Sequence, residues 1–136
     1  MIPKIIHYCW LGDSEFPELV KKCIQSWKKK MPDWEFILWD KNCLKDLNSD
    51  WVNEAYSTKK YAFAADYIRL YAVNKFGGFY LDSDVEVLKN FAPLLDSPYI
   101  FALENEIGDI EAATFGSEPN NPYVPVSYTH LTLPTT

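Results

Sequence analysis

Residues 59–88, KKYAFAADYIRLYAVNKFGGFYLDSDVEVL, contain the pattern that decides the fold. Their first part predicts a long helix over residues 59–78 that ends at the Gly-Gly pair. A hydrophobic strand follows at once, and Asp82 and Asp84 interrupt it. A buried carboxylate is costly unless it is paired, hydrogen-bonded or bound to a metal, so this pair is the first place to look for function.

The rest of the chain alternates between strand-like and helix-like segments. Strands are predicted at residues 4–10 and 34–40, with a helix from Pro17 to Met31 between them, which gives a parallel strand–helix–strand unit. The further expected elements are short helical pieces at 42–48 and 50–57, a turn of helix at 91–97, and strands at 99–106 and 111–116. Such alternation predicts an α/β fold with an open, mostly parallel sheet.

The composition is that of one folded domain, or part of one. The 136 residues are 48% hydrophobic and 16% aromatic, which favours a packed core over a disordered segment. A net charge of −6 argues against nucleic acid as a partner. Cys9, Cys23 and Cys43 lack the spacing of a zinc site and are expected to be reduced thiols. No signal peptide or transmembrane segment is evident, so we expect the chain in the cytosol, with the inner face of the membrane as the alternative.

Residues 126–136, VSYTHLTLPTT, differ in character from the rest, since they include no charged residue and have no clear period. They resemble the translated end of a sequencing adaptor, so we interpret them as a non-native tail after residues 1–125. A genuine strand rich in Thr and Leu is the alternative. If the tail is non-native, His130 has no function and His7 is the one native histidine. We expect His7 to be a hydrogen-bonded core residue.

The spacing of Asp82 and Asp84 suggests a metal site. Residues i and i+2 of a strand point to the same side, so the two carboxylates are expected to project together while Ser83 faces away. Two like charges this close repel each other, and a divalent cation relieves the conflict. Oxygen ligands favour Mg²⁺ or Mn²⁺, whose remaining positions are commonly filled by water and phosphate. The pair therefore predicts a phosphorylated ligand beyond the carboxyl ends of the strands.

Two other interpretations of the aspartate pair were weighed. An EF-hand loop starting at Asp82 requires Gly at its sixth position and Glu at its twelfth, where this chain has Val87 and Pro93. The motif LDSDV also resembles the nucleophile motif of haloacid-dehalogenase-type phosphatases, in which the first Asp attacks phosphate. That motif usually lies on an early strand, whereas here a strand–helix–strand unit precedes it. The phosphatase is therefore the weaker alternative.

Asp66 and Arg69 lie three positions apart on the predicted helix and so share a face that can meet one ligand. Ala62, Ala64 and Ala65 keep this stretch slim, which allows close packing or close approach of a bound molecule. An ordinary helix-surface ion pair, worth about 0.3–0.5 kcal/mol, is the alternative. The Gly-Gly turn that leads straight into the two aspartates favours a functional role.

Two stretches, IPKIIHYCWLG at 2–12 and YAFAADYIRLYAVNKFGGFYLDSDVEVL at 61–88, resemble the DXD-containing sugar-binding region of a glycosyltransferase family. This family includes Och1-type mannosyltransferases and bacterial capsular-polysaccharide transferases, and the glucosylating clostridial toxins share a similar core. The resemblance covers roughly residues 2–105 in a recognisable order of motifs. It implies a Rossmann-like GT-A fold, of which residues 1–125 are the N-terminal, donor-binding part.

The resemblance also implies roles for individual residues in binding a nucleotide-sugar donor. Trp10 would stack on the base, an interaction worth about 1–3 kcal/mol where it has been measured, with a core tryptophan as the alternative. Asp66 would accept hydrogen bonds from sugar hydroxyls, and Arg69 would bind sugar or phosphate oxygens. Tyr80 is expected either near the donor or packed against the helix.

The aspartate pair is the metal-binding part of the implied site. Asp84 would bind Mn²⁺ or Mg²⁺ directly, while Asp82 would contact ribose and sugar and reach the metal, in one version through water. The implied reaction moves a hexose from a UDP- or GDP-hexose to a saccharide or lipid-linked saccharide acceptor, with retention of configuration, as in capsule or lipopolysaccharide synthesis. No catalytic nucleophile is identified, and Asp109 and Glu111 receive no role. A non-catalytic nucleotide-sugar-binding module is the main alternative.

Overall fold

The computed structural model describes residues 1–43, 47, 50–103 and 110–121. The non-native tail predicted at 126–136, with His130, and the predicted site neighbour Asp109 lie outside the described residues. The elements in chain order are β1 (Ile5–Cys9), α1 (Glu18–Lys30), β2 (Glu35–Trp39), η1 (Lys41–Cys43), α3 (Asp50–Ser57), α4 (Tyr61–Phe76), β3 (Gly78–Leu81), η2 (Ala92–Leu94), β4 (Tyr99–Leu103) and β5 (Ile110–Ser117). The order of helices and strands follows the sequence prediction closely.

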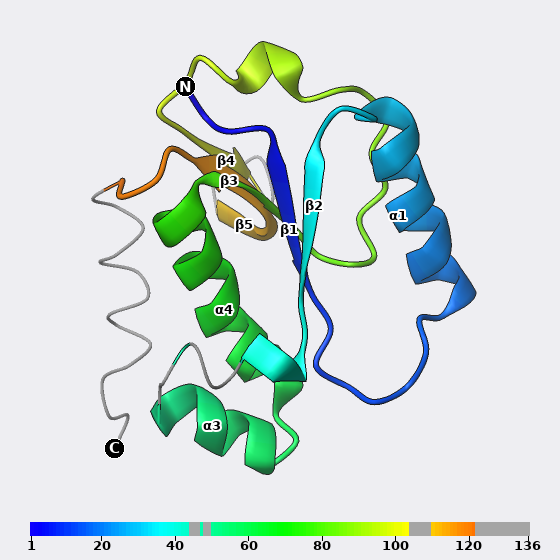
Figure 1. Cartoon of the computed structure of the whole chain (residues 1–136), viewed down its shortest axis with the longest axis vertical. Coiled ribbons are helices and arrows are strands. Elements are labelled where there is room, and N and C mark those ends of the chain that lie inside the picture. Colours follow the sequence, from blue (N-terminus) through cyan, green and yellow to red (C-terminus); the bar gives the residue numbers. More distant parts are fainter. Residues whose placement is uncertain (44–46, 48–49, 104–109, 122–136) are drawn as a thin grey trace.

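The strands form one five-stranded sheet in the order β2-β1-β3-β5-β4 (Figure 1). β1 pairs in parallel with both β2 and β3, whereas β5 is antiparallel to β3 and to β4. Four of the five strands therefore run in the same direction, and β5 alone is reversed. This confirms the prediction of an α/β fold with an open, mostly parallel sheet.

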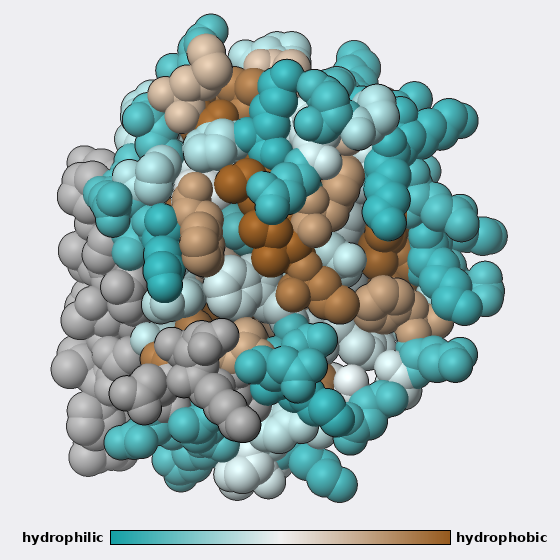
Figure 2. All heavy atoms as spheres, in the orientation of Figure 1, coloured by the Kyte–Doolittle hydropathy of each residue, from teal (hydrophilic) through white to brown (hydrophobic). Residues whose placement is uncertain are grey.

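Helices cover both faces of the sheet, with α1 on one side and α3 and α4 on the other (Figure 1). Successive strand residues point to opposite faces, so the sheet contributes to two separate cores. The core beneath α1 includes Ile6, Tyr8, Phe79 and Leu81, and the core beneath α4 includes Cys9, Tyr80 and Phe115. The outer side of α1 is covered by hydrophilic side chains, which Figure 2 shows along that edge of the molecule.

A close backbone contact explains the Gly-Gly pair between α4 and β3. Gly77 and Gly78 have φ angles of 71° and 105°, which favour glycine. A Cβ atom added to Gly78 would lie 2.6 Å from the carbonyl oxygen of Ile5, and one added to Gly77 would lie 2.7 Å from Cδ of Pro119. Only glycine lets the chain turn here and run beside β1.

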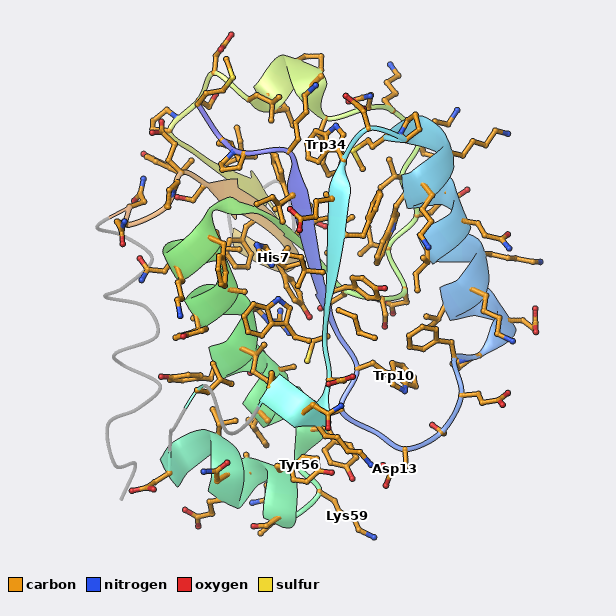
Figure 3. The ribbon with its side chains drawn as sticks, viewed as in Figure 1. His7, Trp10, Asp13, Trp34, Tyr56 and Lys59 are labelled. Carbon is orange, nitrogen blue, oxygen red and sulfur yellow. The ribbon has the colours of Figure 1, made fainter. Side chains whose placement is uncertain are left out.

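His7 connects this turn to two strands. It is fully buried in β1, and its Nε2 lies 2.8 Å from the carbonyl oxygen of Gly77. The indole Nε1–H of Trp39, on β2, donates to His7 Nδ1 over 3.0 Å. Because an indole can only donate, Nδ1 must be the acceptor and Nε2–H the donor to Gly77. Figure 3 shows His7 between β1 and α4. Its burial and its two hydrogen bonds confirm the prediction of a hydrogen-bonded core histidine.

We expect His7 to make the stability of the fold depend on pH. Burial lowers the pKa of His7 from 6.5 to about 4, and the hydrogen bond to Gly77 offsets only part of this effect. Because the folded pKa is below the unfolded value, the full contribution is present above pH 6.5 and is lost as the pH falls towards about 4. The loss should be about 3 kcal/mol in the free energy of unfolding, measured by urea titration.

The matched variant for this experiment is Trp39→Phe, which removes the indole donor and leaves Nδ1 free to take a proton. The pKa of His7 should then rise, and the loss of stability between about pH 6.5 and pH 4 should become smaller. An unchanged pH dependence in Trp39→Phe would show that His7 is not the titrating group.

No helix in the described part of the chain has both the length and the apolar character required to cross a membrane.

Candidate functional site

A cleft of about 630 Å³ opens at the carboxyl ends of β1 and β3. Its walls come from the segment after β1, the start of α1, one side of α4 and the segment after β3. The lining residues are Cys9, Trp10, Leu11, Gly12, Ser14, Pro17, Val20, Tyr61, Ala65, Arg69, Tyr80, Asp82, Ser83 and Asp84. Five of the six predicted site residues are therefore brought together in one cleft. Asp66 is not among the lining residues but contacts one of them.

Arg69, the only arginine in the sequence, is the charged centre of the cleft. Its Nη2 lies 3.2 Å from Oδ1 of Asp66 and 3.5 Å from Oδ1 of Asp82, and its side chain is only 12% exposed. Its Nε–H donates to the carbonyl oxygen of Ala65 over 3.4 Å. The ion pair between Asp66 and Arg69, the alternative to a ligand-binding role, is present, but it is more than a helix-surface ion pair, because Arg69 also connects α4 to the segment after β3. A role of the two residues in binding one ligand stays a prediction.

Tyr80 lies directly beneath this guanidinium. The Cζ atom of Arg69 is 4.9 Å from the centre of the Tyr80 ring, a distance that allows a cation–π interaction. Burial is the main reason why the pKa of Tyr80 is raised, and a hydrogen bond with Asp82 raises it further. The phenol therefore stays neutral. Burial also raises the pKa of Asp66, and the attraction of Arg69 offsets this only in part.

Asp82 and Asp84 do not lie on a strand, which corrects the prediction made from their spacing. β3 ends at Leu81, and the backbone N–H of Val85 donates to the carbonyl oxygen of Asp82 over 3.0 Å, which closes a turn. The chain then leaves the sheet, and side chains of α1 provide hydrogen-bond partners at Val85 and Val87. Ser83 lines the cleft together with both aspartates, so all three residues of the turn contribute to its wall.

Trp10 follows β1 immediately and forms part of the cleft wall. Its Nε1–H donates to the carbonyl oxygen of Ser14 over 3.0 Å, and its ring meets Phe16 edge to face, with centroids 5.3 Å apart. Figure 3 shows Trp10 between the end of β1 and α1. The residue is only half-buried, so its ring has surface left for a ligand.

Several lining residues were not predicted from the sequence. Tyr61 stands opposite Gly12, where an added Cβ atom would lie 3.9 Å from the tyrosine ring. Ser14 and Pro17 come from the turn-like segment before α1, which has no distinctive pattern. The alanine-rich stretch of the helix was predicted to allow close packing or close approach of a ligand. Ala65 lines the cleft, and Ala64 is buried in the core. Burial raises the pKa of Cys9 to about 12, so its thiol is a neutral part of the wall.

The residues present fit a hard divalent cation in part. Asp84 is exposed at the cleft and offers carboxylate oxygens, which Mg²⁺ and Mn²⁺ prefer. Asp82 shares its carboxylate with Arg69 and is less available. Within residues 1–43, 47, 50–103 and 110–121, no three His, Cys, Asp or Glu side chains gather closely enough to hold a metal ion. A cation here would need oxygens in addition to those that the described residues supply.

Comparison with known proteins places this cleft in a family. The family model described as "Glycosyltransferase sugar-binding region containing DXD motif" matches residues 17–101, more than half of the chain. The chain belongs to this glycosyltransferase family. The match includes Asp66, Arg69, Tyr80 and both aspartates, whereas Trp10 lies before it.

Curated relatives include fungal mannosyltransferases. Inositol phosphoceramide mannosyltransferase 3 of Schizosaccharomyces pombe is 34% identical over 101 residues, which cover 71% of this chain and 28% of that protein. Mannosyl phosphorylinositol ceramide synthase SUR1 of Saccharomyces cerevisiae is 29% identical over 127 residues, which cover 90% of this chain and 33% of that protein. The chain thus spans about a third of the length of these relatives.

A solved structure supports the fold. The PaToxG glycosyltransferase superposes with a TM-score of 0.71 at 20% sequence identity, and the match covers 94% of this chain and 58% of that one. The α/β architecture is therefore that of a known glycosyltransferase structure.

We expect Arg69→Lys to destabilise the protein by about 1–3 kcal/mol, because lysine cannot reach two carboxylates and the Tyr80 ring with one planar group. Urea unfolding at neutral pH measures the change. The matched control is Lys75→Arg, on the same helix, whose exposed ammonium lies 5.5 Å from the Tyr71 ring centre. The control should change stability by no more than about 0.5 kcal/mol. Equal effects of the two variants would show that Arg69 is an ordinary surface residue.

Proposed function

We propose that the cleft binds a nucleoside-diphosphate hexose and that the enzyme transfers the hexose to a saccharide or lipid-linked acceptor. The observation that carries this proposal is the meeting of Arg69, the turn with Asp82 and Asp84, and Trp10 around one cleft. A diphosphate sugar has a flat base, two negative phosphates and a ring of hydroxyls. The cleft offers the aromatic ring of Trp10, the guanidinium of Arg69, and the carboxylates of Asp82 and Asp84, at which a metal could bind.

Each part of the donor has a complementary group in this proposal. The base stacks on Trp10, and the guanidinium of Arg69 binds sugar or phosphate oxygens. Asp82 and Asp66 accept hydrogen bonds from hydroxyls, with Asp66 also holding Arg69 in place. Tyr80 supports the guanidinium from below. The assignment of residues 1–125 to donor binding is part of the same proposal.

Asp84 is the direct metal ligand in this proposal, and Asp82 contributes through water or through the ribose. A bound Mn²⁺ or Mg²⁺ supplies positive charge to the leaving diphosphate. Arg69 adds a fixed positive charge at the same end of the cleft, where its low exposure strengthens the interaction. The carboxylates of Asp82 and Asp84 serve donor and metal binding, so neither is proposed as a nucleophile. Retention of configuration then depends on how the acceptor is positioned beside the donor.

We choose the first donor and acceptor to test from the names of the curated relatives. Those proteins are named for mannose transfer to inositol phosphoceramide, so GDP-mannose is the first donor to test. A UDP-hexose and a capsule or lipopolysaccharide acceptor remain predictions from the bacterial resemblance. Cytosolic or membrane-surface location also remains a prediction. The phosphatase alternative is disfavoured because Asp82 is held by Arg69 and by the Tyr80 hydroxyl.

Calorimetric titration of GDP-mannose and UDP-glucose into the 136-residue chain, with and without Mn²⁺, tests the proposal. We expect binding of one donor that requires Mn²⁺ and weakens more than about tenfold in Asp84→Ala. The matched control is Asp96→Ala, an exposed aspartate outside the cleft, which should bind like the unchanged protein.

Two results would contradict the proposal. Binding that does not depend on Mn²⁺ or on Asp84 would show that the aspartate pair is not a metal site. Release of phosphate from an aryl phosphate, lost in Asp82→Asn, would instead support the phosphatase.

A further inference from the structure

The segment after the aspartate turn is attached to α1 rather than to the sheet. In Figure 1 the chain crosses from the end of β3 to α1 before it returns to η2. Leaving a sheet exposes backbone N–H and C=O groups, and buried ones need new partners. Side chains of α1 provide them at Val85 and Val87, just beyond Asp84.

Trp27 makes the first of these contacts. Its indole Nε1–H donates to the carbonyl oxygen of Val85 over 2.7 Å, and its ring is fully buried. The ring also meets Tyr8 of β1 edge to face, with centroids 5.2 Å apart. The donor is therefore fixed between α1 and the sheet and cannot follow a movement of the segment.

Ser26 makes the second contact. Its hydroxyl accepts a hydrogen bond from the backbone N–H of Val87 over 2.9 Å and donates to the carbonyl oxygen of Cys23 over 2.6 Å. Because the hydroxyl is used in both directions, its orientation is set by the helix itself. Farther along, the side-chain amide of Asn90 donates to the carbonyl oxygen of Lys30 over 2.9 Å.

These contacts determine where Asp84 can lie. The turn is closed by the hydrogen bond from Val85 to Asp82, and Val85 is in turn held by Trp27. On its other side, Asp82 is paired with Arg69. Asp84 thus sits on a short loop fixed at both ends, although its own side chain is exposed. A metal ligand whose side chain is exposed, as that of Asp84 is, needs a backbone that holds it in position.

We propose that Trp27 and Ser26 are positioning residues, which act through the backbone of Val85 and Val87 to hold Asp84 in the cleft. This inference rests on the proposed function, because it assigns to α1 the support of the metal-binding turn. Trp27 is then more than a core aromatic: its ring fills the core, and its N–H serves the site.

Trp34 provides a matched control within the same core. Its ring packs against Phe79 and Phe91 on the α1 side of the sheet, and its Nε1 is buried with no hydrogen-bond partner among the described residues. Trp34→Phe and Trp27→Phe therefore make the same chemical change in one hydrophobic cluster. Only Trp27→Phe removes a bond to the aspartate turn.

The experiment combines amide hydrogen exchange with calorimetry on the 136-residue chain and its Trp27→Phe, Ser26→Ala and Trp34→Phe variants. Exchange at residues 84–87 should be about five- to tenfold faster in Trp27→Phe and Ser26→Ala. Binding of GDP-mannose in the presence of Mn²⁺ should weaken about 10–100-fold in the same two variants. Trp34→Phe should match the unchanged protein in both measurements. Ser26→Ala is the smaller change, so it tests whether the contacts with α1 hold the turn if Trp27→Phe does not fold.

Two results would overturn the inference, and a third would overturn the proposed function on which it rests. If Trp27→Phe and Ser26→Ala behave like Trp34→Phe in both measurements, the contacts with α1 do not hold the turn. If exchange becomes faster while Mn²⁺-dependent binding is unchanged, Trp27 and Ser26 hold the segment, but metal binding at Asp84 does not depend on these contacts. If the unchanged protein shows no Mn²⁺-dependent binding, the proposed function itself fails, and the exchange data still report on these contacts.

Discussion

The backbone of Gly78 lies so close to Ile5 that no side chain fits between them, and this contact sets the position of β3 beside β1. Because the two strands are parallel, their carboxyl ends lie at the same edge of the sheet. The chain there continues into Trp10 on one side and into Asp82 on the other, so the walls of the cleft follow from the pairing. His7 strengthens the same junction, since it joins the carbonyl oxygen of Gly77 to the indole of Trp39.

The second requirement is the neutralisation of a nearly buried guanidinium. An arginine with 12% exposure needs negative partners, because removing its charge from water is costly. Asp66 comes from the same helix turn, and Asp82 comes from the segment after β3. Arg69 therefore joins α4 to the aspartate turn, and a residue that contributes to the charge of the site also contributes to the fold.

Much of this architecture could be predicted from local sequence patterns. The helix before the Gly-Gly pair is marked by the glycines that end it, and the first two strands follow from short β-branched and aromatic runs, signals that act over a few positions. The Asp66–Arg69 pair also follows from local spacing. The path of the chain after Asp82 could not be predicted in this way, because Trp27, which donates to the carbonyl oxygen of Val85, lies 58 residues from Val85. The predicted strand is present up to Leu81, and beyond it the backbone at Val85 and Val87 is hydrogen-bonded to distant side chains on α1. Tyr61 and Ser14 reach the cleft only through tertiary packing, so no local signal marked them.

We propose that one cleft holds a metal at Asp84 and a diphosphate between that metal and Arg69. A crystal of the 136-residue chain soaked with Mn²⁺ and GDP, with anomalous diffraction recorded at the manganese edge, tests this most directly. The account predicts one strong anomalous peak beside the Asp84 carboxylate, with the guanine ring against Trp10. A peak away from the turn, or a nucleotide bound outside the cleft, would contradict it.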